Sequence, residues 1–357
     1  MSDMNIKNWY TGKKPWIIAG PCSAETEEQM LETVGQISAQ GIDTIRAGVW
    51  KPRTRPNSFE GVGGAAFPWI KKAKERYAVK FAVEVATPRH VELALENDID
   101  YLWIGARTTV NPFNVQEIAN SLKGVKNVPV FVKNPVNPDL NLWIGALERI
   151  QQAGIEQLAA IHRGFSTYQE SVYRNIPLWQ IPIDLKSRFP DLLLINDPSH
   201  IAGKRDLLFE IAQKAMNLQF DGLMIESHNN PSQAWSDAAQ QLTPHNLAEM
   251  LARISIREAK LPTAAFQNKL EKIRDAIDET DKELLEVIAR RFDLVRQVGE
   301  YKKDKNVAIF QLERWQTILK NRPEWGKDLK LAPSYVKELY QSIHDESIRI
   351  QTEIYNN

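Results

Sequence analysis

Short runs rich in β-branched residues alternate with longer amphipathic stretches from Trp16 to Ile256, and this alternation constrains the fold more than any other feature. Eight such runs occur, at residues 16–19, 44–47, 81–85, 101–104, 130–133, 157–162, 192–196 and 222–226. The stretches between them, such as 27–40, 138–153 and 206–216, carry apolar residues at helical spacing. Eight consecutive β/α units predict an α/β fold of the parallel (β/α)8 TIM-barrel type.

An open, doubly wound sheet is the structural alternative for such an alternating pattern. That fold more often carries a glycine-rich dinucleotide-binding turn directly after its first strand. Here the first run is followed by Gly20-Pro21-Cys22-Ser23, which is not that motif. The closed barrel is therefore the favoured prediction.

The composition of the chain excludes several classes of protein. The 357 residues include 45 Lys and Arg against 45 Asp and Glu, so no overall charge favours nucleic acid or an anionic membrane. A single cysteine excludes a disulfide framework and a cysteine-rich zinc module. No apolar run approaches the ~20 residues of a membrane span. Because the first residues are polar, we expect no signal peptide. We expect a cytoplasmic metabolic enzyme.

The sequence pattern of the chain changes after about residue 257. We expect a barrel domain at 1–258, a linker at 259–267 and an all-α domain at 268–357. Helices are predicted at 268–305, 312–321 and 334–355; the first would be ~55 Å long. A helix of that length needs a partner for its apolar stripe, so we expect a homodimer through it. A simple oligomerisation bundle is the alternative.

Basic residues follow several of the predicted strands. Catalytic groups of a barrel stand at the C-terminal ends of its strands. The basic residues at these ends are Arg46, Lys51, Arg53, Arg107, Lys133 and Arg163. Because clustered cations need anions, and Arg and Lys suit phosphate and carboxylate, we infer one polyanionic or two anionic substrates.

The same ends carry groups that can bind a metal. Cys22, His200, Glu226 and Asp237 offer a thiolate, an imidazole and two carboxylates. This mixed set fits one divalent Mn, Fe, Co or Zn ion better than Mg or Ca. His228 is the second choice as a ligand, and His162 is expected to point away from the site because side chains alternate along a strand. Aldol-type condensation, isomerisation and phosphate hydrolysis all remain open at this point.

These motifs, in order and one per strand, resemble the 3-deoxy-D-arabino-heptulosonate-7-phosphate (DAHP) synthases of the short type I branch. They are Gly20-Pro21-Cys22-Ser23, Arg46-Ala47-Gly48, Lys51-Pro52-Arg53-Thr54, Gly105-Ala106-Arg107, Asp197-Pro198-Ser199-His200, and Glu226 to Asp237. The resemblance implies condensation of phosphoenolpyruvate with erythrose 4-phosphate, the first step toward aromatic amino acids. A related synthase family that makes 3-deoxy-octulosonate 8-phosphate typically has an Asn-containing variant where this chain has residues 51–54.

The resemblance also implies a role for each matching residue. Cys22, His200, Glu226 and Asp237 would hold the divalent metal, with Mn2+ the first choice. The residues that would bind phosphoenolpyruvate are Arg46, Lys51, Arg107, Lys133 and Arg163. Of these, Lys133 would carry a proton. Pro52, Arg53 and Thr54 would bind erythrose 4-phosphate.

The last ninety or so residues resemble the all-helical chorismate mutases. The matching residues are Arg274, Ile277, Asp281, Arg291, Lys302, Arg314, Ser347 and Gln351. The resemblance implies that Arg291 binds a carboxylate and that Lys302 and Gln351 hydrogen-bond the ether oxygen of chorismate. Arg314 and Ser347 would line the pocket, and Arg274 would reach it from the partner protomer.

Two positions depart from the mutase pattern, because Gln311 and Trp315 stand where many members have Asp and Glu. A helical domain that only dimerises and binds a regulatory ligand is therefore an alternative to an active mutase. The fusion itself suggests a bifunctional enzyme whose helical domain carries feedback inhibition by prephenate or chorismate. A barrel acting on another sugar phosphate, such as arabinose 5-phosphate, is a further alternative.

Overall fold

The computed structural model describes residues 4, 6–51, 59–168, 170–257 and 264–356. The chain divides into two compact units, Met1–Ala259 and Lys260–Asn357. Each unit has its own secondary-structure class, α/β in the first and all-α in the second.

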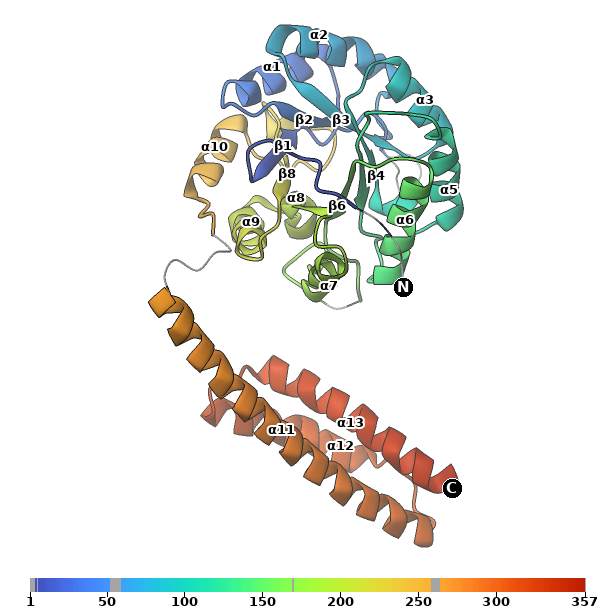
Figure 1. Cartoon of the computed structure of the whole chain (residues 1–357), viewed down its shortest axis with the longest axis vertical. Helices are drawn as coiled ribbons and strands as arrows, with labels where there is room; N and C mark the ends of the chain where they lie inside the picture. Colours follow the sequence, from blue (N-terminus) through green and yellow to red (C-terminus); the bar gives the residue numbers. More distant parts are fainter. Residues whose placement is uncertain (1–3, 5, 52–58, 169, 258–263, 357) are drawn as a thin grey trace. The chain divides into compact units, whose positions relative to one another are not determined.

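Eight parallel strands of the first unit close into a barrel, which confirms the predicted (β/α)8 fold (Figure 1). Each strand pairs with its neighbours in sequence, and β1 closes the ring by pairing with β8. The strands are β1 Trp16–Gly20, β2 Thr44–Ala47, β3 Lys80–Val85, β4 Tyr101–Ile104, β5 Val130–Lys133, β6 Leu158–His162, β7 Leu193–Asn196 and β8 Gly222–Glu226. They differ from the predicted runs by a residue at most at either end.

Helices surround the barrel (Figure 1). They are α1 Glu27–Ser38, α2 Phe67–Tyr77, α3 Pro88–Glu96, α4 Ala106–Thr109, α5 Pro112–Ser121, α6 Leu140–Gln152, α7 Gln180–Arg188, α8 Pro198–Ala202, α9 Leu208–Asn217 and α10 Pro244–Arg253. Three 3-10 turns, Gly63–Ala66, Arg205–Leu207 and Pro231–Gln233, lie in the connections. Side chains at several helix starts accept backbone N–H groups, as Thr26 does from Gln29 and Asp197 from His200.

Strand residues alternate between the barrel interior and the helical layer, as the pleat of a β-strand requires. The interior cluster includes Ile18, Trp103 and Phe131, all fully buried. Residues before β1 fill the N-terminal end of the barrel: Tyr10 stacks on Trp16, and the Trp9 indole donates to the Leu158 carbonyl oxygen over 2.8 Å. The opposite end, where the strands finish, is therefore the mouth available for chemistry.

The second unit consists of three helices, α11 Ala264–Asp304, α12 Leu312–Asp328 and α13 Pro333–Asn356. The first begins four residues before the predicted start at Asn268. The second continues seven residues beyond the predicted end at Asn321, through Pro323. Packing between α12 and α13 stabilises this extension, because Gly326 lies against Val336, where an added Cβ would approach Val336 Cγ2 to 2.6 Å.

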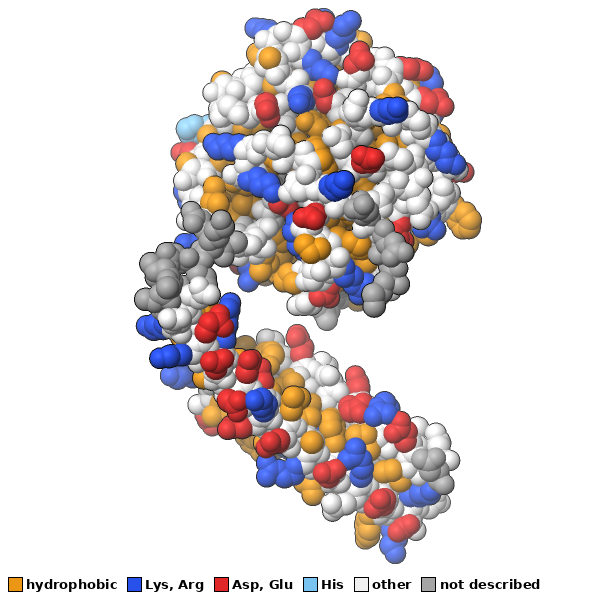
Figure 2. Space-filling model, in the orientation of Figure 1, with side chains coloured by type: hydrophobic (Ala, Val, Ile, Leu, Met, Phe, Trp, Pro, Cys, Tyr) orange, Lys and Arg blue, Asp and Glu red, His pale blue; other side chains and the backbone are white. Residues whose placement is uncertain are grey.

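Figure 2 shows charges of both signs spread over the visible face, with apolar atoms exposed along the helical unit. Exposed apolar residues of α11 include Ile273, Ile277, Leu284 and Leu285. Within the part of the chain that the structure describes, no helix is long and apolar enough to cross a membrane.

Candidate active site

A ring of charged side chains stands on the last inward-facing layer of the barrel, above the indole of Trp103. The Arg46 guanidinium lies 5.2 Å from the Trp103 ring centroid, and Lys133 Nζ lies 5.6 Å from it. Glu84 of β3 accepts a hydrogen bond from Trp103 Nε1 over 3.1 Å. Residues of β2 and β5 therefore place two cations that the sequence analysis singled out at one end of the barrel, and β3 adds the Glu84 carboxylate there.

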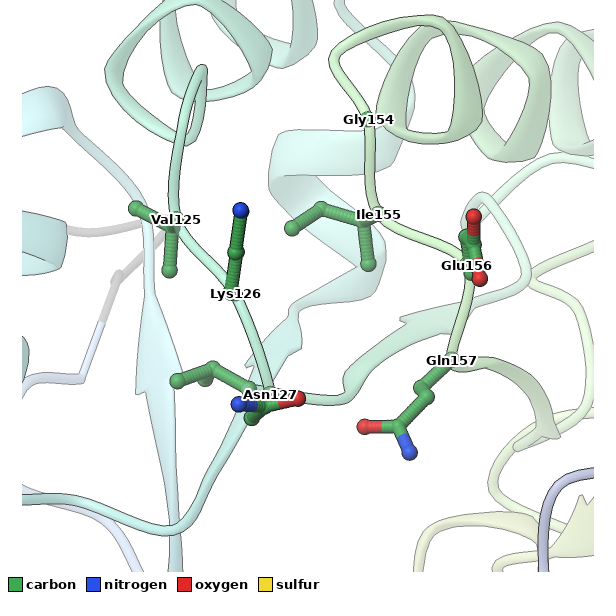
Figure 3. Close-up of a pocket in the computed structure, with 8 residues that line it drawn as sticks. Val125, Lys126, Asn127, Gly154, Ile155, Glu156 and Gln157 are labelled. Atoms are coloured by element: carbon green, nitrogen blue, oxygen red, sulfur yellow. The ribbon is translucent and has the colours of Figure 1, made fainter.

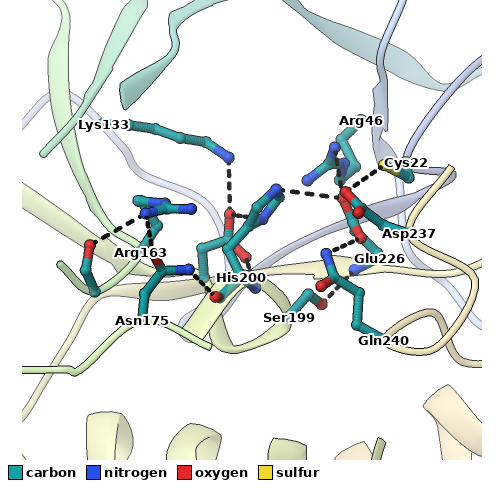
Figure 4. Close-up of polar contacts among 12 residues, drawn as sticks. Cys22, Arg46, Lys133, Arg163, Asn175, Ser199, His200, Glu226, Asp237 and Gln240 are labelled. Carbon is teal, nitrogen blue, oxygen red and sulfur yellow. Dashed lines mark hydrogen bonds and ion pairs between the residues drawn. The ribbon is translucent and has the colours of Figure 1, made fainter. Parts of the chain in front are cut away.

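Three of the four predicted metal ligands meet at this mouth (Figure 4). One ligand atom each from Cys22, Glu226 and Asp237 lies within 4.8 Å of the other two. The fourth residue, His200, stands beside them with Nε2 at 3.7 Å from Glu226 Oε1. A thiolate, two carboxylates and an adjacent imidazole form a donor set that fits a divalent transition metal.

Buried hydrogen bonds hold the two loops that carry Cys22 and Asp237. Ser23 Oγ and Ser236 Oγ lie 2.5 Å apart, and the Gln241 side chain bonds both the Cys22 N–H and the Ser236 carbonyl oxygen. The backbone of Asp237 has a φ of +46°, a left-handed conformation that few non-glycine residues adopt. Arg174 donates to Asp237 Oδ1 over 3.0 Å. The loops and Arg174 thus fix the carboxylate of Asp237 in place.

The thiol of Cys22 has a strongly raised pKa in the absence of a metal. Burial and the nearby Glu226 carboxylate raise this pKa to about 12, although Lys51 opposes them with its Nζ at 2.9 Å from Sγ. A divalent cation at this position would supply the positive charge that a thiolate needs. Glu226 Oε1 is also buried without a hydrogen-bond partner among the described residues, so the residues present fit a metal ion.

Four of the predicted cations, Arg46, Lys51, Lys133 and Arg163, are buried at the mouth. Arg46 lies 3.2 Å from Glu226, yet its Nε and Nη1 atoms have no hydrogen-bond partner among the described residues. Burial, and to a smaller extent the charges of Arg174 and Arg107, lower the pKa of Arg163 to about 10. Because buried guanidinium groups need hydrogen-bond acceptors, this layer favours an anionic ligand.

Arg107 is exposed. Its charge contributes to lowering the pKa of Arg163, so Arg107 lies toward the same mouth. The predicted residues Pro52, Arg53 and Thr54 lie outside the described residues. His228, the second choice as metal ligand, instead pairs with Glu25 at 3.3 Å. His162 faces the helical layer as predicted, with Nε2 at 2.6 Å from the Pro177 carbonyl oxygen.

Three polar residues of the mouth were not assigned a role by the sequence analysis: Glu84, Arg174 and Asp197. Asp197 is fully buried and lies 2.8 Å from both Lys133 Nζ and His200 Nδ1. Burial alone would raise the pKa of Asp197, but the adjacent His200 and Lys133 hold it well below the usual range. The alternation rule could have found Glu84, since it occupies the inward position two residues after Ala82.

A second polar cluster lies in the helical unit. Arg291 of α11 donates to Ser347 Oγ over 3.0 Å, and the Gln351 side chain donates to the Ser347 carbonyl oxygen over 3.2 Å. The other amide atom of Gln351, Oε1, is buried without a partner among the described residues. Lys302 donates to the Ile309 carbonyl oxygen over 2.6 Å.

Further cations stand near Arg291. Burial lowers its pKa, Tyr340 partly opposes this, and the charges of Arg322 and Arg314 lower it further. Arg314 is exposed, whereas the Nε atom of Arg322, a residue not singled out from the sequence, is buried without a partner among the described residues. Such a group of arginines favours an anionic ligand.

Trp315, one of the two departures from the mutase pattern, stacks on His344 with ring centroids 4.0 Å apart. Gln311, the other, is an exposed residue that precedes α12. Arg274 is exposed and bonds only Glu271 among the described residues. It precedes Arg291 by 17 residues on α11, a separation of roughly 25 Å along a helix. Within one chain, Arg274 is therefore not brought to the Arg291 cluster.

A cavity of about 300 Å³ lies between the segments that precede β5 and β6. Figure 3 shows residues that line it. Its lining includes Lys126, Asn127, Glu156 and Gln157. These residues lie at the N-terminal ends of the strands, away from the mouth with the charged layer. The cavity is therefore separate from the candidate active site.

The fold and its mouth define a barrel enzyme with a site for anionic groups and a cluster that can hold a metal. Comparison with known families agrees: the model of the DAHP synthetase I family matches residues 5–259, and that of chorismate mutase type II matches residues 273–352. The chain belongs to the DAHP synthetase I family and joins to its synthase domain a chorismate mutase domain. It is a bifunctional enzyme.

Individual relatives match each part. Phospho-2-dehydro-3-deoxyheptonate aldolase of Thermotoga maritima is 30% identical over 246 residues, 68% of each chain. The crystal structure of DAHP synthase from Thermotoga maritima aligns with a TM-score of 0.60 and 27% identity over 67% of each chain. The 4-amino-4-deoxychorismate mutase of Streptomyces pristinaespiralis is 29% identical over 90 residues, which cover 25% of this chain and 70% of that protein.

Proposed function

We propose that the barrel catalyses metal-dependent condensation of phosphoenolpyruvate with erythrose 4-phosphate, releasing DAHP and phosphate. The observation that carries this proposal is the joint placement of two features at one mouth: the Cys22, Glu226 and Asp237 cluster, and the buried cations beside it. Membership of the DAHP synthetase I family supports it. We include a cytoplasmic location in the proposal.

Most of the charged residues at the mouth would bind substrate, and one would transfer a proton. Arg46, Lys51 and Arg163, with Arg107 at the rim, would hold the carboxylate and phosphate of phosphoenolpyruvate and offset repulsion between the two anionic substrates. Carbon 3 of phosphoenolpyruvate would then attack the aldehyde of erythrose 4-phosphate, water would add at carbon 2, and phosphate would leave. Lys133, whose Nζ lies over the Trp103 ring at the mouth, is the proposed proton carrier.

Cys22, His200, Glu226 and Asp237 would hold the metal, which supplies Lewis-acid polarisation of the aldehyde when bound. We propose Mn2+ as the usual ion, with Co, Fe or Zn as substitutes. The soft thiolate of Cys22 disfavours Mg and Ca. The buried Gln240 amide, which donates to Glu226 Oε2 over 2.7 Å, and the Ser199 hydroxyl, which accepts from the Glu226 N–H, would orient that carboxylate.

The test is consumption of phosphoenolpyruvate by the full chain with erythrose 4-phosphate, in Mn2+ and after EDTA. Turnover that EDTA abolishes and Mn2+ restores is expected. A parallel assay with arabinose 5-phosphate separates the alternative substrate, since preference for it would reject the erythrose 4-phosphate assignment. If none of the four metals supports turnover, the proposed condensation is rejected.

We propose that the helical unit converts chorismate to prephenate. Arg291 and Arg314 would bind carboxylates, while Lys302 and Gln351 would stabilise negative charge on the breaking ether bond. The buried, unpartnered Gln351 Oε1 beside the Arg291–Ser347 pair supports a ligand site. Chorismate turnover by the full chain tests it. If chorismate binds without turnover, the alternative of a non-catalytic dimerisation and ligand-binding module is preferred.

We further propose a homodimer through α11. Ile273, Ile277, Leu284 and Leu285 are exposed in the single chain, and a second copy would bury them. The same contact would bring Arg274 of the partner into the cationic cluster, which its own chain does not do. Sedimentation of the full chain tests the stoichiometry, and a monomer that retains mutase activity would reject this arrangement.

We also propose that prephenate or chorismate bound in the helical unit inhibits the barrel by feedback. Such coupling needs different affinities of the ligand for two states of the enzyme. Synthase kinetics measured at saturating prephenate test the coupling. Unchanged kinetics would mean that the two activities share a chain without regulation.

A further inference from the structure

One carboxylate oxygen at the barrel mouth contacts both a predicted metal ligand and the predicted proton carrier. Asp197 Oδ2 lies 2.8 Å from Lys133 Nζ and 2.8 Å from His200 Nδ1. The other oxygen, Oδ1, accepts the backbone N–H of His200 over 3.1 Å and so caps α8. Asp197 is fully buried, so solvent does not weaken these contacts.

The contact with His200 determines which ring nitrogen is available to a metal. Nδ1 is buried and faces this oxygen in an ion-pair contact that lacks hydrogen-bond geometry among the described residues. Because an ionised carboxylate only accepts hydrogen bonds, the contact favours the tautomer that carries the proton on Nδ1. The lone pair is then left on Nε2, which is 3.7 Å from Glu226 Oε1 and faces the Cys22, Glu226 and Asp237 cluster. Figure 4 shows His200 between Lys133 on one side and Glu226 and Asp237 on the other.

The contact with Lys133 restrains the second group. Lys133 is the last residue of β5 and is buried, with Nζ above the Trp103 ring. Among the described residues, Lys133 Nζ donates a hydrogen bond to Asp197 Oδ2. A flexible four-carbon side chain is thus directed by the same oxygen atom that orients the imidazole.

We propose that Asp197 is a positioning residue that aims Nε2 of His200 at the metal and holds the Lys133 ammonium beside the reacting carbons. The inference rests on the function proposed for the barrel. It adds that metal affinity and the placement of the proton carrier depend on one buried carboxylate, which itself touches neither metal nor substrate.

The test measures the affinity of the full chain for Co2+ alone, by competition with a chromophoric chelator and by the visible absorption of bound Co2+. Asp197→Asn is expected to weaken Co2+ binding about 10- to 100-fold, the usual effect of losing a group that orients a metal ligand. Asparagine still caps a helix well, so α8 is expected to remain folded. Asp197→Ser, which also caps but is too short to reach Nδ1, is the second variant should the first fail to fold.

Two comparisons separate positioning from a general structural effect. In a His200→Ala background, Asp197→Asn should weaken Co2+ binding no further, because the two residues act through one contact. Asp206→Asn makes the same chemical change at an exposed position and should leave affinity and activity unchanged. Lys133→Met should retain Co2+ affinity while losing turnover.

Parental Co2+ affinity in both Asp197 variants, or additive losses with His200→Ala, would overturn the inference. The affinity measurement uses no substrate. If the variants lose affinity as expected but the parent does not condense phosphoenolpyruvate with erythrose 4-phosphate, the proposed reaction fails while the assignment to His200 stands.

Discussion

Arg46 Nη2 lies 3.2 Å from Glu226 Oε1, and both side chains are excluded from solvent (1% and 0% exposed). Burial alone would lower the pKa of Arg46, but Glu226 and Asp197 raise it, so the guanidinium stays charged. The pair joins a substrate-binding candidate of β2 to a metal-ligand candidate of β8. Removal of either partner leaves the other as a buried, uncompensated charge.

Arg46→Ala is therefore expected to destabilise the barrel by about 3–5 kcal/mol, besides abolishing condensation. Urea unfolding of the full chain at neutral pH measures the loss. Arg89→Ala is the matched control, since Arg89 pairs with Glu92 on the surface at 3.0 Å and should remain near parental stability. Equal effects of the two substitutions would show that burial of the Arg46 pair does not matter.

Cys22→Ser should change the metal preference of the barrel. Replacing a soft thiolate with a hydroxyl removes affinity for Zn2+ and Co2+ more than for Mn2+, because thiolate ligands favour the softer ions. Dissociation constants of the three ions, measured on parent and variant, give the comparison. Unchanged dissociation constants for all three ions would indicate that Cys22 only fills space beside Asp237, and a uniform loss would indicate that its contribution does not depend on the softness of the ion.

The strands of the barrel were predictable because their β-branched runs are buried on both faces and are bounded by turns. The orientation of His162 away from the mouth followed from alternation along β6, and the structure confirms it. The length of α12 was not predictable, since its continuation through Pro323 depends on contacts with α13 that local propensity does not describe.

The cations of the mouth were easier to recognise than the carboxylates that pair with them. Arg46 and Lys133 lie in the last two residues of their strands, and Arg163 directly follows β6. The roles of Glu84 and Asp197, in contrast, depend on neighbours from other strands. Glu84 bonds Trp103 of β4, and Asp197 contacts Lys133 of β5. Likewise, the pairing of His228 with Glu25 joins residues 203 positions apart, which no local motif encodes.

His162 predicts a pH dependence of barrel stability. Burial lowers its pKa to about 4 in the folded protein, against an opposing hydrogen bond to Pro177, while an unfolded histidine titrates near ~6.5. The unfolded state therefore binds the proton more tightly. The stabilising effect is fully present above about pH 6.5 and is lost as the pH falls toward 4, by up to roughly 3 kcal/mol.

Urea unfolding of the full chain between pH 7 and pH 4.5 checks this, with His162→Gln as the comparison. Glutamine can still donate to the Pro177 carbonyl oxygen but does not titrate. The stability of the parent should therefore fall more steeply below pH 6.5 than that of the variant. Parallel curves would assign the acid sensitivity to other groups.

Lys302 and Lys303 offer a matched pair for the helical unit, because neighbouring lysines of α11 each donate to one backbone carbonyl. Lys302 bonds Ile309 over 2.6 Å, and Lys303 bonds Ile354 over 2.9 Å. Only Lys302 is proposed to meet the ether oxygen of chorismate. Lys302→Ala should therefore reduce kcat for chorismate by about 100-fold or more, as loss of a charge-stabilising donor does.

Lys303→Ala removes the same charge from the same helix and should leave kcat near the parental value. Thermal unfolding of both variants shows whether the helices remain packed. If Lys302→Ala leaves chorismate turnover intact, the pocket at Arg291 does not act on the ether bond, and the helical unit is better described as a ligand-binding module. If both substitutions abolish turnover together with folding, Lys302→Arg, which keeps the charge, should restore folding without full activity, since its planar fork does not reproduce a single ammonium donor.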